Sequence, residues 1–251
     1  STRLNTLFPY TTLFRSALTH GYAGKLLTVD LDRRTVETPD LDPAVRDYFV
    51  GGRGLGLYLL HRRLTPGTTP DDPGIPLIFA PGPLGGIPQF PGTSKCMAVS
   101  LSPLTGIPGV SNFGGHFGAY LKYAGFDALQ ISGKSAREVM LVDGFRRDVS
   151  LMEPPAGDHV FDLEKEIVGR FVAAGCDRKD MAFLSTGIGA ARTAYGCINS
   201  HYFDPTKPAD GTKGLFRTKQ AGRTGLGTVM TDKKLRAVVV LAEFPKGDNP
   251  Y

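Results

Sequence analysis

Three glycine-rich segments carry the residue types in this 251-residue chain that are best suited to binding an anion. They are FAPGPLGG (79–86), GVSNFGGHFG (109–118) and KQAGRTGLGTVM (219–230). Each follows an expected strand or precedes an expected helix, where backbone N–H groups point outward and a helix N-terminus adds partial positive charge. Taken singly, such a segment is more often an ordinary tight turn. Taken together with the nearby cations Lys95, Lys219 and Arg223, the three predict a cradle for a phosphorylated ligand.

The chain is poor in residue patterns that would carry catalysis. It has no HExxH, no GxSxG and no GxxxxGK[ST], and His116 is the only histidine inside a glycine-rich segment. The segment GIGAAR (187–192) imitates a dinucleotide fingerprint, but Arg192 replaces its third glycine and no acidic residue is expected to end a following strand at the required distance. We therefore predict no catalytic residue, no Rossmann site and no P-loop.

The three cysteines, Cys96, Cys176 and Cys197, have no CxxC spacing. Zinc and iron–sulfur sites usually take four ligands, so these thiols do not form such a site by themselves. Their odd number also argues against a closed disulfide framework. We expect buried structural thiols.

Composition indicates an ordinary globular protein, with 41% hydrophobic and 21% charged residues. The net charge of +5 comes from 29 basic residues with 24 acidic residues interleaved among them, so a nucleic-acid partner is not favoured. That alternative would predict a salt-dependent affinity for DNA. No apolar run approaches the roughly 18 residues of a membrane helix, and no signal peptide precedes Gly21, so we expect no membrane association and a cytoplasmic location.

The stretch LFPYTTLFRS (7–16) looks like a translated sequencing adapter, and the chain opens on serine. We therefore treat residues 1–20 as a probable assembly scar without structural meaning. The alternative is a genuine N-terminal strand rich in aromatic and β-branched residues.

The expected elements alternate irregularly between strands and helices, which predicts an α+β fold with mixed or antiparallel sheets. Two halves share a pattern of strand, glycine turn, short helix and strand, consistent with a low-grade internal duplication. Expected helices begin at the Asp42-Pro43 cap, at Leu57 after a break at GGRGLG (51–56), and at an Asp162 cap before a stop at Gly175. The expected strands include RTAYGCIN (192–199), and residues 201–216 are expected to form a surface loop.

The ordered set of motifs resembles the aldehyde ferredoxin oxidoreductase family. It comprises GYAGKLLTVDL, VGGRGLGLYLL, FAPGPLGG, SPLTGIPGVSNFGGHFGAYLKYAGFDALQISGK and AGRTGLGTVMTDKKLRAVVV. The resemblance covers Gly21 to about Ala242 and is to the family's N-terminal domain, assigned here to 21–245. Residues 246–251 would begin the linker to C-terminal domains that this chain lacks.

The resemblance implies two mixed or antiparallel sheets, related by a pseudo-twofold axis and carrying short helices, that form a platform for a cofactor. The cofactor would be a bis-pterin holding tungsten or molybdenum, with a magnesium ion between the pterin phosphates. The site residues it implies are Lys95, Asn112, Gly114, Gly115, Lys219, Gln220, Ala221, Gly222 and Arg223. The backbone of Asn112 would contact the magnesium, and Lys95 and Lys219 stand where the family has arginines.

The resemblance further implies that the intact protein oxidises an aldehyde to a carboxylic acid and passes electrons through a 4Fe–4S cluster to ferredoxin. The cluster ligands would lie in the missing domains, the intact protein would be a homo-oligomer, and this fragment alone would be inactive. Two alternatives stay open. One is a stand-alone pterin-binding accessory module, and the other is a domain of a related tungsten enzyme such as a class II benzoyl-CoA reductase.

Overall fold

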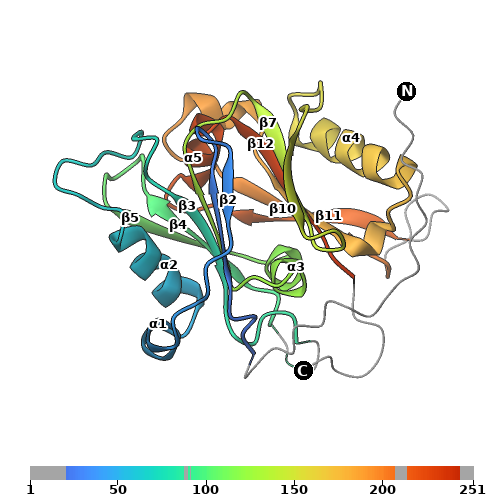
Figure 1. Cartoon of the computed structure of the whole chain (residues 1–251). Helices are drawn as coiled ribbons and strands as arrows, with labels where there is room; N and C mark the ends of the chain where they lie inside the picture. Colours follow the sequence, from blue (N-terminus) through green and yellow to red (C-terminus); the bar gives the residue numbers. More distant parts are fainter. Residues whose placement is uncertain (1–20, 88–89, 91, 207–213, 244–251) are drawn as a thin grey trace.

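Two six-stranded β-sheets form the molecule, as the computed structural model in Figure 1 shows for residues 21–87, 90, 92–206 and 214–243. The first sheet has the strand order β2-β1-β6-β3-β4-β5 and the second has the order β8-β7-β12-β9-β10-β11. Each sheet contains one pair of parallel neighbours, β1 and β6 in the first sheet and β7 and β12 in the second. All other neighbouring strands are antiparallel. The expected α+β class with mixed sheets is confirmed.

The first half of the chain supplies the first sheet. Its elements are β1 (Leu26–Asp30), β2 (Thr35–Glu37), α1 (Pro43–Phe49), α2 (Gly52–His61), β3 (Leu77–Pro81), β4 (Cys96–Leu101), β5 (Pro108–Phe113), α3 (Phe117–Tyr123) and β6 (Ala128–Ser132).

The second half repeats this order of strands and supplies the second sheet. Its elements are β7 (Glu138–Asp143), β8 (Asp148–Met152), α4 (Val160–Ala173), the 3-10 helix η1 (Arg178–Asp180), β9 (Met181–Ser185), the 3-10 helix η2 (Ile188–Arg192), β10 (Ile198–Asp204), β11 (Leu215–Ala221), α5 (Leu226–Asp232) and β12 (Leu235–Leu241). In both halves a hairpin, a covering helix, three strands, a two-turn helix and a final strand follow one another. The predicted duplication is therefore present at the level of topology.

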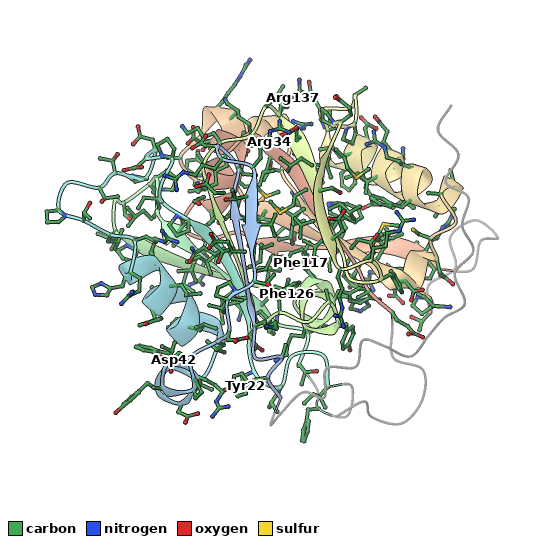
Figure 2. All side chains as sticks on the ribbon, in the orientation of Figure 1. Tyr22, Arg34, Asp42, Phe117, Phe126 and Arg137 are labelled. Atoms are coloured by element: carbon green, nitrogen blue, oxygen red, sulfur yellow. The ribbon has the colours of Figure 1, made fainter. Side chains whose placement is uncertain are left out.

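The short helices α3 and α5 contact strands of both sheets, whereas α2 covers the outer face of the first sheet and α4 that of the second (Figure 1). A single apolar cluster fills the space between the sheets, and Phe117 of α3 lies in it without any exposure. Figure 2 shows Phe117 in the middle of the molecule, with Tyr22 and Arg137 at opposite ends. Two smaller clusters lie beneath α2 and α4. The core is thus layered as helix, sheet, short helices, sheet, helix.

Helix α2 begins earlier than predicted, because the glycine segment 51–56 is mostly helical. The glycines serve close packing: a Cβ at Gly56 would lie 2.6 Å from Cγ2 of Val99 in β4. The helix therefore rests directly on the sheet, and glycine is retained despite its cost of about 1 kcal/mol in a helix interior.

Three other boundaries differ from the sequence expectation. Helix α4 starts at Val160 with His159 as its N-cap, so Asp162 lies in its first turn rather than at the cap. Of the expected strand 192–199 only the last residues are extended, and the strand β10 continues to Asp204. Both ends of the expected loop 201–216 are therefore strands, since β10 and β11 form an antiparallel pair from Ile198↔Ala221 to Asp204↔Leu215. Residues 207–213, like the predicted scar 1–20 and linker 246–251, lie outside the described residues.

Candidate functional site

The edge strands β5 and β11 bring the two halves of the candidate site together, because they lie against each other between the sheets. Within the first sheet, β4 and β5 pair so that Cys96 is opposite Phe113 and Met97 is opposite Asn112. Lys95, which precedes β4, and Gly114, which follows β5, therefore stand at the same end of the sheet. The exposed Asn112 is the next-to-last residue of its strand.

Two lysines from different halves meet over Gly114. The Cβ position of Gly114 is 3.6 Å from Nζ of Lys95 and 3.6 Å from Cγ of Lys219 in β11. Gly114 itself is buried, while both lysines are exposed. A Cβ at position 114 would lie at ordinary contact distance from the Lys95 ammonium and from the aliphatic stem of Lys219, so both side chains border this turn.

The reciprocal contact links the second glycine turn to the first sheet. The backbone N–H of Arg223 donates to Oγ of Ser111 at 3.0 Å, and Ser111 lies in β5. Ser111 and Lys219 occupy equivalent places, each two residues before the end of its edge strand. Each turn thus rests on the other half's strand, as a twofold axis would require. Asn112 and Gly222 consequently lie in the same region of the molecule.

Gly115 supports the first turn from below. Its backbone is left-handed, with φ of +91°, and its Cβ position is 2.6 Å from Oγ of Ser200 and 3.2 Å from the ring of Tyr202. Ser200 is fully buried, and its hydroxyl has no hydrogen-bond partner among the described residues. Any side chain at position 115 would be strained and would collide with β10.

The charge of the site is uncompensated. Within the described part of the chain, Lys95, Lys219 and Arg223 form no ion pair. A bound anion in this region would be attracted by these exposed cations. These residues therefore fit a ligand that carries phosphate groups.

His116 closes the first turn as the N-cap of α3, and it makes no side-chain cap hydrogen bond. Its ring lies parallel to that of Tyr120 at 5.9 Å and meets that of Tyr202 at 4.7 Å. Burial lowers the pKa of His116, and the negative charge of Asp204 opposes that shift. His116 is therefore biased toward its neutral form and adds no cation to the site. The helices α3 and α5 have seven residues each, so the glycine turns, rather than long helix dipoles, would provide the N–H donors.

In the segment FAPGPLGG (79–86), packing explains Gly85 and Gly86, whereas a Cβ at Gly82 would meet no atom within 4 Å. A Cβ at Gly86 would lie 2.8 Å from the ring of Tyr123, whose hydroxyl donates to the Gly86 carbonyl at 2.6 Å. A Cβ at Gly85 would lie 2.9 Å from the carbonyl oxygen of Gly82 and 3.2 Å from the Lys122 side chain. Two of the three predicted glycine segments thus come together around Lys95, while this one mainly secures α3.

GIGAAR (187–192) is not a dinucleotide site. It forms the 3-10 helix η2, and the strands before and after it, β9 and β10, are antiparallel. A dinucleotide fingerprint needs two parallel strands joined by an α-helix. The segment 187–192 therefore lacks the geometry of a dinucleotide fingerprint.

A Ser–His–Glu array escaped the sequence analysis. Nε2 of His201 lies 2.7 Å from Oγ of Ser185, and Nδ1 lies 2.6 Å from Oε2 of Glu164. The His201 ring also stacks on Phe183 at 4.3 Å. Ser185 and His201 have no exposure, so no substrate reaches the hydroxyl, and the array joins α4 to the second sheet instead of forming a nucleophilic site. No local motif could reveal it, because its members are 16 and 37 positions apart.

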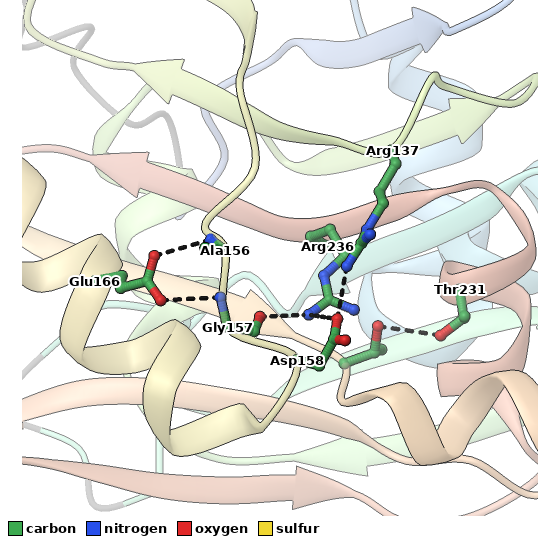
Figure 3. Close-up of polar contacts among 8 residues, drawn as sticks. Arg137, Ala156, Gly157, Asp158, Glu166, Thr231 and Arg236 are labelled. Carbon is green, nitrogen blue, oxygen red and sulfur yellow. Dashed lines mark hydrogen bonds and ion pairs between the residues drawn. The ribbon is translucent and has the colours of Figure 1, made fainter.

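A second polar cluster lies at the N-terminal end of α4 (Figure 3). Asp158 Oδ1 accepts from Arg137 at 2.6 Å and lies 3.3 Å from Arg236, which also donates to the Gly157 carbonyl. Glu166 accepts the N–H groups of Ala156 and Gly157, both at 2.9 Å. Arg236 is aimed here because it is the extra residue of a β-bulge in β12. The cluster fixes the loop before α4.

No group of three or more histidine, cysteine or acidic residues that could hold a metal occurs among the described residues. Burial raises the pKa of the Cys96 thiol, which is fully enclosed. Burial also raises the pKa of Cys176, which is partly exposed. None of the helices described here has the length and apolarity needed to span a bilayer.

Comparisons with known proteins agree with the motif resemblance. A family model described as "Aldehyde ferredoxin oxidoreductase, N-terminal domain" matches residues 26–242. A tungsten-containing aldehyde ferredoxin oxidoreductase of Pyrococcus abyssi is 32% identical over 222 residues, covering 88% of this chain and 33% of that protein. The WOR-like subunit of an aliphatic sulfonate oxidoreductase of Pyrococcus furiosus is 40% identical over 126 residues, covering 49% of this chain and 20% of that protein.

Among solved structures, the active site complex BamBC of benzoyl coenzyme A reductase, in complex with 1,5-dienoyl-CoA, superposes with a TM-score of 0.74. The sequence identity is 27%, and the match covers 88% of this chain and 31% of that chain. This chain thus spans about a third of the length of the tungsten-containing aldehyde oxidoreductases it matches.

Proposed function

The chain belongs to the aldehyde ferredoxin oxidoreductase family as its N-terminal domain, and from this membership we propose that it forms the cofactor platform of a tungsten-dependent oxidoreductase. The observation that carries the proposal is the meeting of Lys95 and Lys219 over Gly114 without a carboxylate partner in the described residues. Exposed cations beside a glycine turn attract an anion, and its binding there is favourable.

The group to be held is a bis-pterin with tungsten, less favourably molybdenum, and a magnesium ion at its phosphates. When bound, it would supply the two-electron redox chemistry of the intact enzyme. The residues of this chain would act on its phosphate end. Three cations would neutralise the phosphate charge: Lys95, Lys219 and Arg223. The backbone of the two glycine turns would approach the phosphates closely, at Gly114, Gly115, Ala221 and Gly222. The Asn112 backbone would offer an oxygen ligand to magnesium, and Gln220 would donate hydrogen bonds.

The intact protein is proposed to oxidise an aldehyde to a carboxylic acid and to pass the two electrons through a 4Fe–4S cluster to ferredoxin. The cluster ligands and the substrate pocket would lie in the remainder of the polypeptide. The intact protein is proposed to be a cytoplasmic homo-oligomer. This chain supplies no catalytic side chain, so the fragment alone is expected to be inactive. An accessory module that only carries the pterin is the alternative of another class.

A second candidate is a benzoyl-CoA reductase-type reaction, in which an aromatic thioester is reduced. The structural similarity to the benzoyl coenzyme A reductase complex, at 27% identity, favours it. Because the platform would hold the same cofactor in either case, the two candidates differ in parts of the protein that lie beyond the platform. Assays of the full-length protein with aldehydes and with benzoyl-CoA would separate them.

The platform is tested by purifying the full-length protein without oxygen and measuring tungsten and pterin per chain. The double variant Lys95→Met/Lys219→Met is expected to retain less than about a fifth of the wild-type tungsten, since two charge-assisted contacts are lost. Lys25→Met, at an exposed lysine paired with Asp40, is the matched control and should retain all of it. Full tungsten content in the double variant would contradict the proposed site.

A further inference from the structure

The outer face of the first sheet is only partly covered by a helix. Helix α2 lies mainly over β3 and β4. A groove with a volume of about 450 Å³ lies beside it, over β1 and β6, and the segment that leads into α1 forms its other wall. None of the residues that line the groove belongs to the glycine turns of the candidate site. The groove is therefore a separate feature of the chain.

The floor of the groove is polar where the second half of the molecule is apolar. Thr28 of β1 and Gln130 of β6 are register partners that border the groove. The middle outward-facing pair of the second sheet is Leu141 and Val239, which belong to the apolar cluster beneath α4. Gln130 is only 6% exposed, and its side-chain amide has no hydrogen-bond partner among the described residues. A nearly buried amide without a partner is unfavourable, so a ligand that hydrogen-bonds to it is favoured.

The wall formed by α2 carries unpaired positive charge. Arg62 and Arg63 are exposed at the C-terminal end of this helix, and neither forms an ion pair within the part of the chain that the structure describes. The two acids of the groove, in the segment before α1, are already engaged. Asp40 pairs with Lys25 at 2.7 Å, and the carboxylate of Asp42 caps α1. The free cations of the groove thus lie on its α2 side.

The rest of the lining is largely apolar and includes Val45 and Leu59. The groove therefore combines two cations, an amide that can both donate and accept, and an aliphatic surface. Its volume lies in the range of small-molecule sites, roughly 300–1,000 Å³. We propose that it binds a small organic carboxylate that also carries an amide and an aliphatic group, such as an N-acylated aliphatic amino acid. The carboxylate pairs with Arg62 and Arg63, the amide pairs with Gln130, and the aliphatic group packs on Leu59.

The test is a titration of the full-length protein with N-acetyl-L-leucine, followed by saturation-transfer NMR. The expected Kd is on the order of 1 mM, as for a ligand of this size. Gln130→Leu should raise the Kd by about tenfold, because the ligand amide loses its partner. Arg62→Met/Arg63→Met should also raise it by about tenfold, because the carboxylate loses both cations. Arg53→Met, at an exposed arginine of α2 that does not line the groove, should leave the Kd unchanged within about a factor of two.

Two analogues test the chemistry of the ligand. N-acetyl-L-leucinamide lacks the carboxylate and 4-methylpentanoate lacks the amide, and each should bind the wild type about tenfold more weakly than N-acetyl-L-leucine. The first analogue should lose nothing further in Arg62→Met/Arg63→Met, and the second should lose nothing further in Gln130→Leu, since the contact concerned is already absent.

Absence of N-acetyl-L-leucine binding by the wild type, or an unchanged Kd in the groove variants, would overturn the proposal. Equal thermal melting curves would show that the variants are folded, and the arginine variants remove only exposed side chains, so they decide the question if Gln130→Leu does not fold. Lys95→Met/Lys219→Met should bind N-acetyl-L-leucine as the wild type does. The groove and the cofactor platform can therefore fail independently.

Discussion

The two halves share one topology but attach their outer helices in opposite ways. Val99 and His201 are each the fourth residue of an equivalent strand, β4 or β10. In the first half, Gly56 of α2 packs directly on Val99. In the second half, α4 reaches His201 through the carboxylate of Glu164. The same backbone position thus tolerates a close apolar contact in one half and a buried polar array in the other, because Ser185 and Glu164 satisfy both ring nitrogens of His201.

The strongest test of the comparison concerns the two buried lysines. Lys122 in the first half pairs with Asp127 at 3.1 Å, and both side chains are at most 3% exposed. Among the described residues, Lys233 in the second half donates only to the carbonyls of Pro73 and Gly133, at 3.2 and 3.3 Å. Lys122→Met should destabilise the fold by about 3–5 kcal/mol, since the buried carboxylate of Asp127 loses its counter-charge and keeps only the backbone N–H groups of Ala23 and Gly24. Chemical denaturation at pH 7 measures this.

Lys233→Met is the counterpart, and the sign of its effect depends on pH. Burial lowers the pKa of Lys233 to about 8, against 10.5 for an ordinary lysine. Between these pH values the unfolded chain binds more protons than the folded chain, so the stability of the wild type rises relative to Lys233→Met. We expect Lys233→Met to be neutral or stabilising at pH 7 and to lose that advantage by pH 10. A loss of several kcal/mol at pH 7 would contradict this account.

A smaller difference is expected at the second residue of each short helix. A Cβ at Gly118 of α3 would lie 2.9 Å from Cβ of Cys96, which is a side-chain atom. A Cβ at Gly227 of α5 would collide with the backbone carbonyl of Cys197. Gly227→Ala should therefore cost about 3 kcal/mol or more and Gly118→Ala about 1–2 kcal/mol. Thermal unfolding of both variants decides this, and Gly169→Ala in α4, where the Cβ meets nothing, should be neutral or slightly stabilising.

The Ser185–His201–Glu164 array of the second half is tested by replacing His201 with an apolar residue, as the equivalent Val99 is in the first half. His201→Leu should destabilise by about 2–3 kcal/mol, because it leaves Ser185 and Glu164 without their shared partner. The double variant His201→Leu/Ser185→Ala should recover about 1 kcal/mol of that loss, since the hydroxyl no longer needs a partner. Additive losses, measured by urea denaturation, would show that the two side chains are not coupled.

The smallest expected effects concern the ion pairs that precede β1 and β7. Lys25 pairs with Asp40, and both are half-exposed or more, so Asp40→Asn should change stability by less than about 0.5 kcal/mol. Before β7, Arg137 pairs with Asp158, which also lies 3.3 Å from Arg236, whose side chain is only 10% exposed. Asp158→Asn should cost about 1–2 kcal/mol, because a nearly buried guanidinium loses its counter-charge. Equal effects in urea denaturation would remove this distinction between the halves.

Sequence patterns identified most elements because their apolar periodicity is strong, as in β3, β9 and β12. They failed where packing overrides local preference. The glycines of α2 look like a break and are instead helical, since Gly56 must fit against Val99. The ends of β10 and β11 look like a polar loop because one edge of the second sheet is exposed, and cross-strand pairing alone makes them strands.

The candidate site was predictable in its parts and not in its assembly. The glycine segments, Lys95 and Lys219 stand out by residue type, and the motif resemblance identified Asn112 and Gly222. Which of them meet depends on contacts between distant positions, such as that of Arg223 with Ser111, which are 112 positions apart. No local pattern contains that information, and the binding roles of these residues stay a prediction.

Each glycine turn contacts the edge strand of the other half, and these two contacts have an evolutionary consequence. A substitution at Ser111 alters the support of Arg223, and one at Lys219 alters the surroundings of Gly114. Neither position of each couple can change without affecting its partner in the other half. Across relatives, these two couples of positions should change together, and their covariation would preserve a record of the ancient pairing.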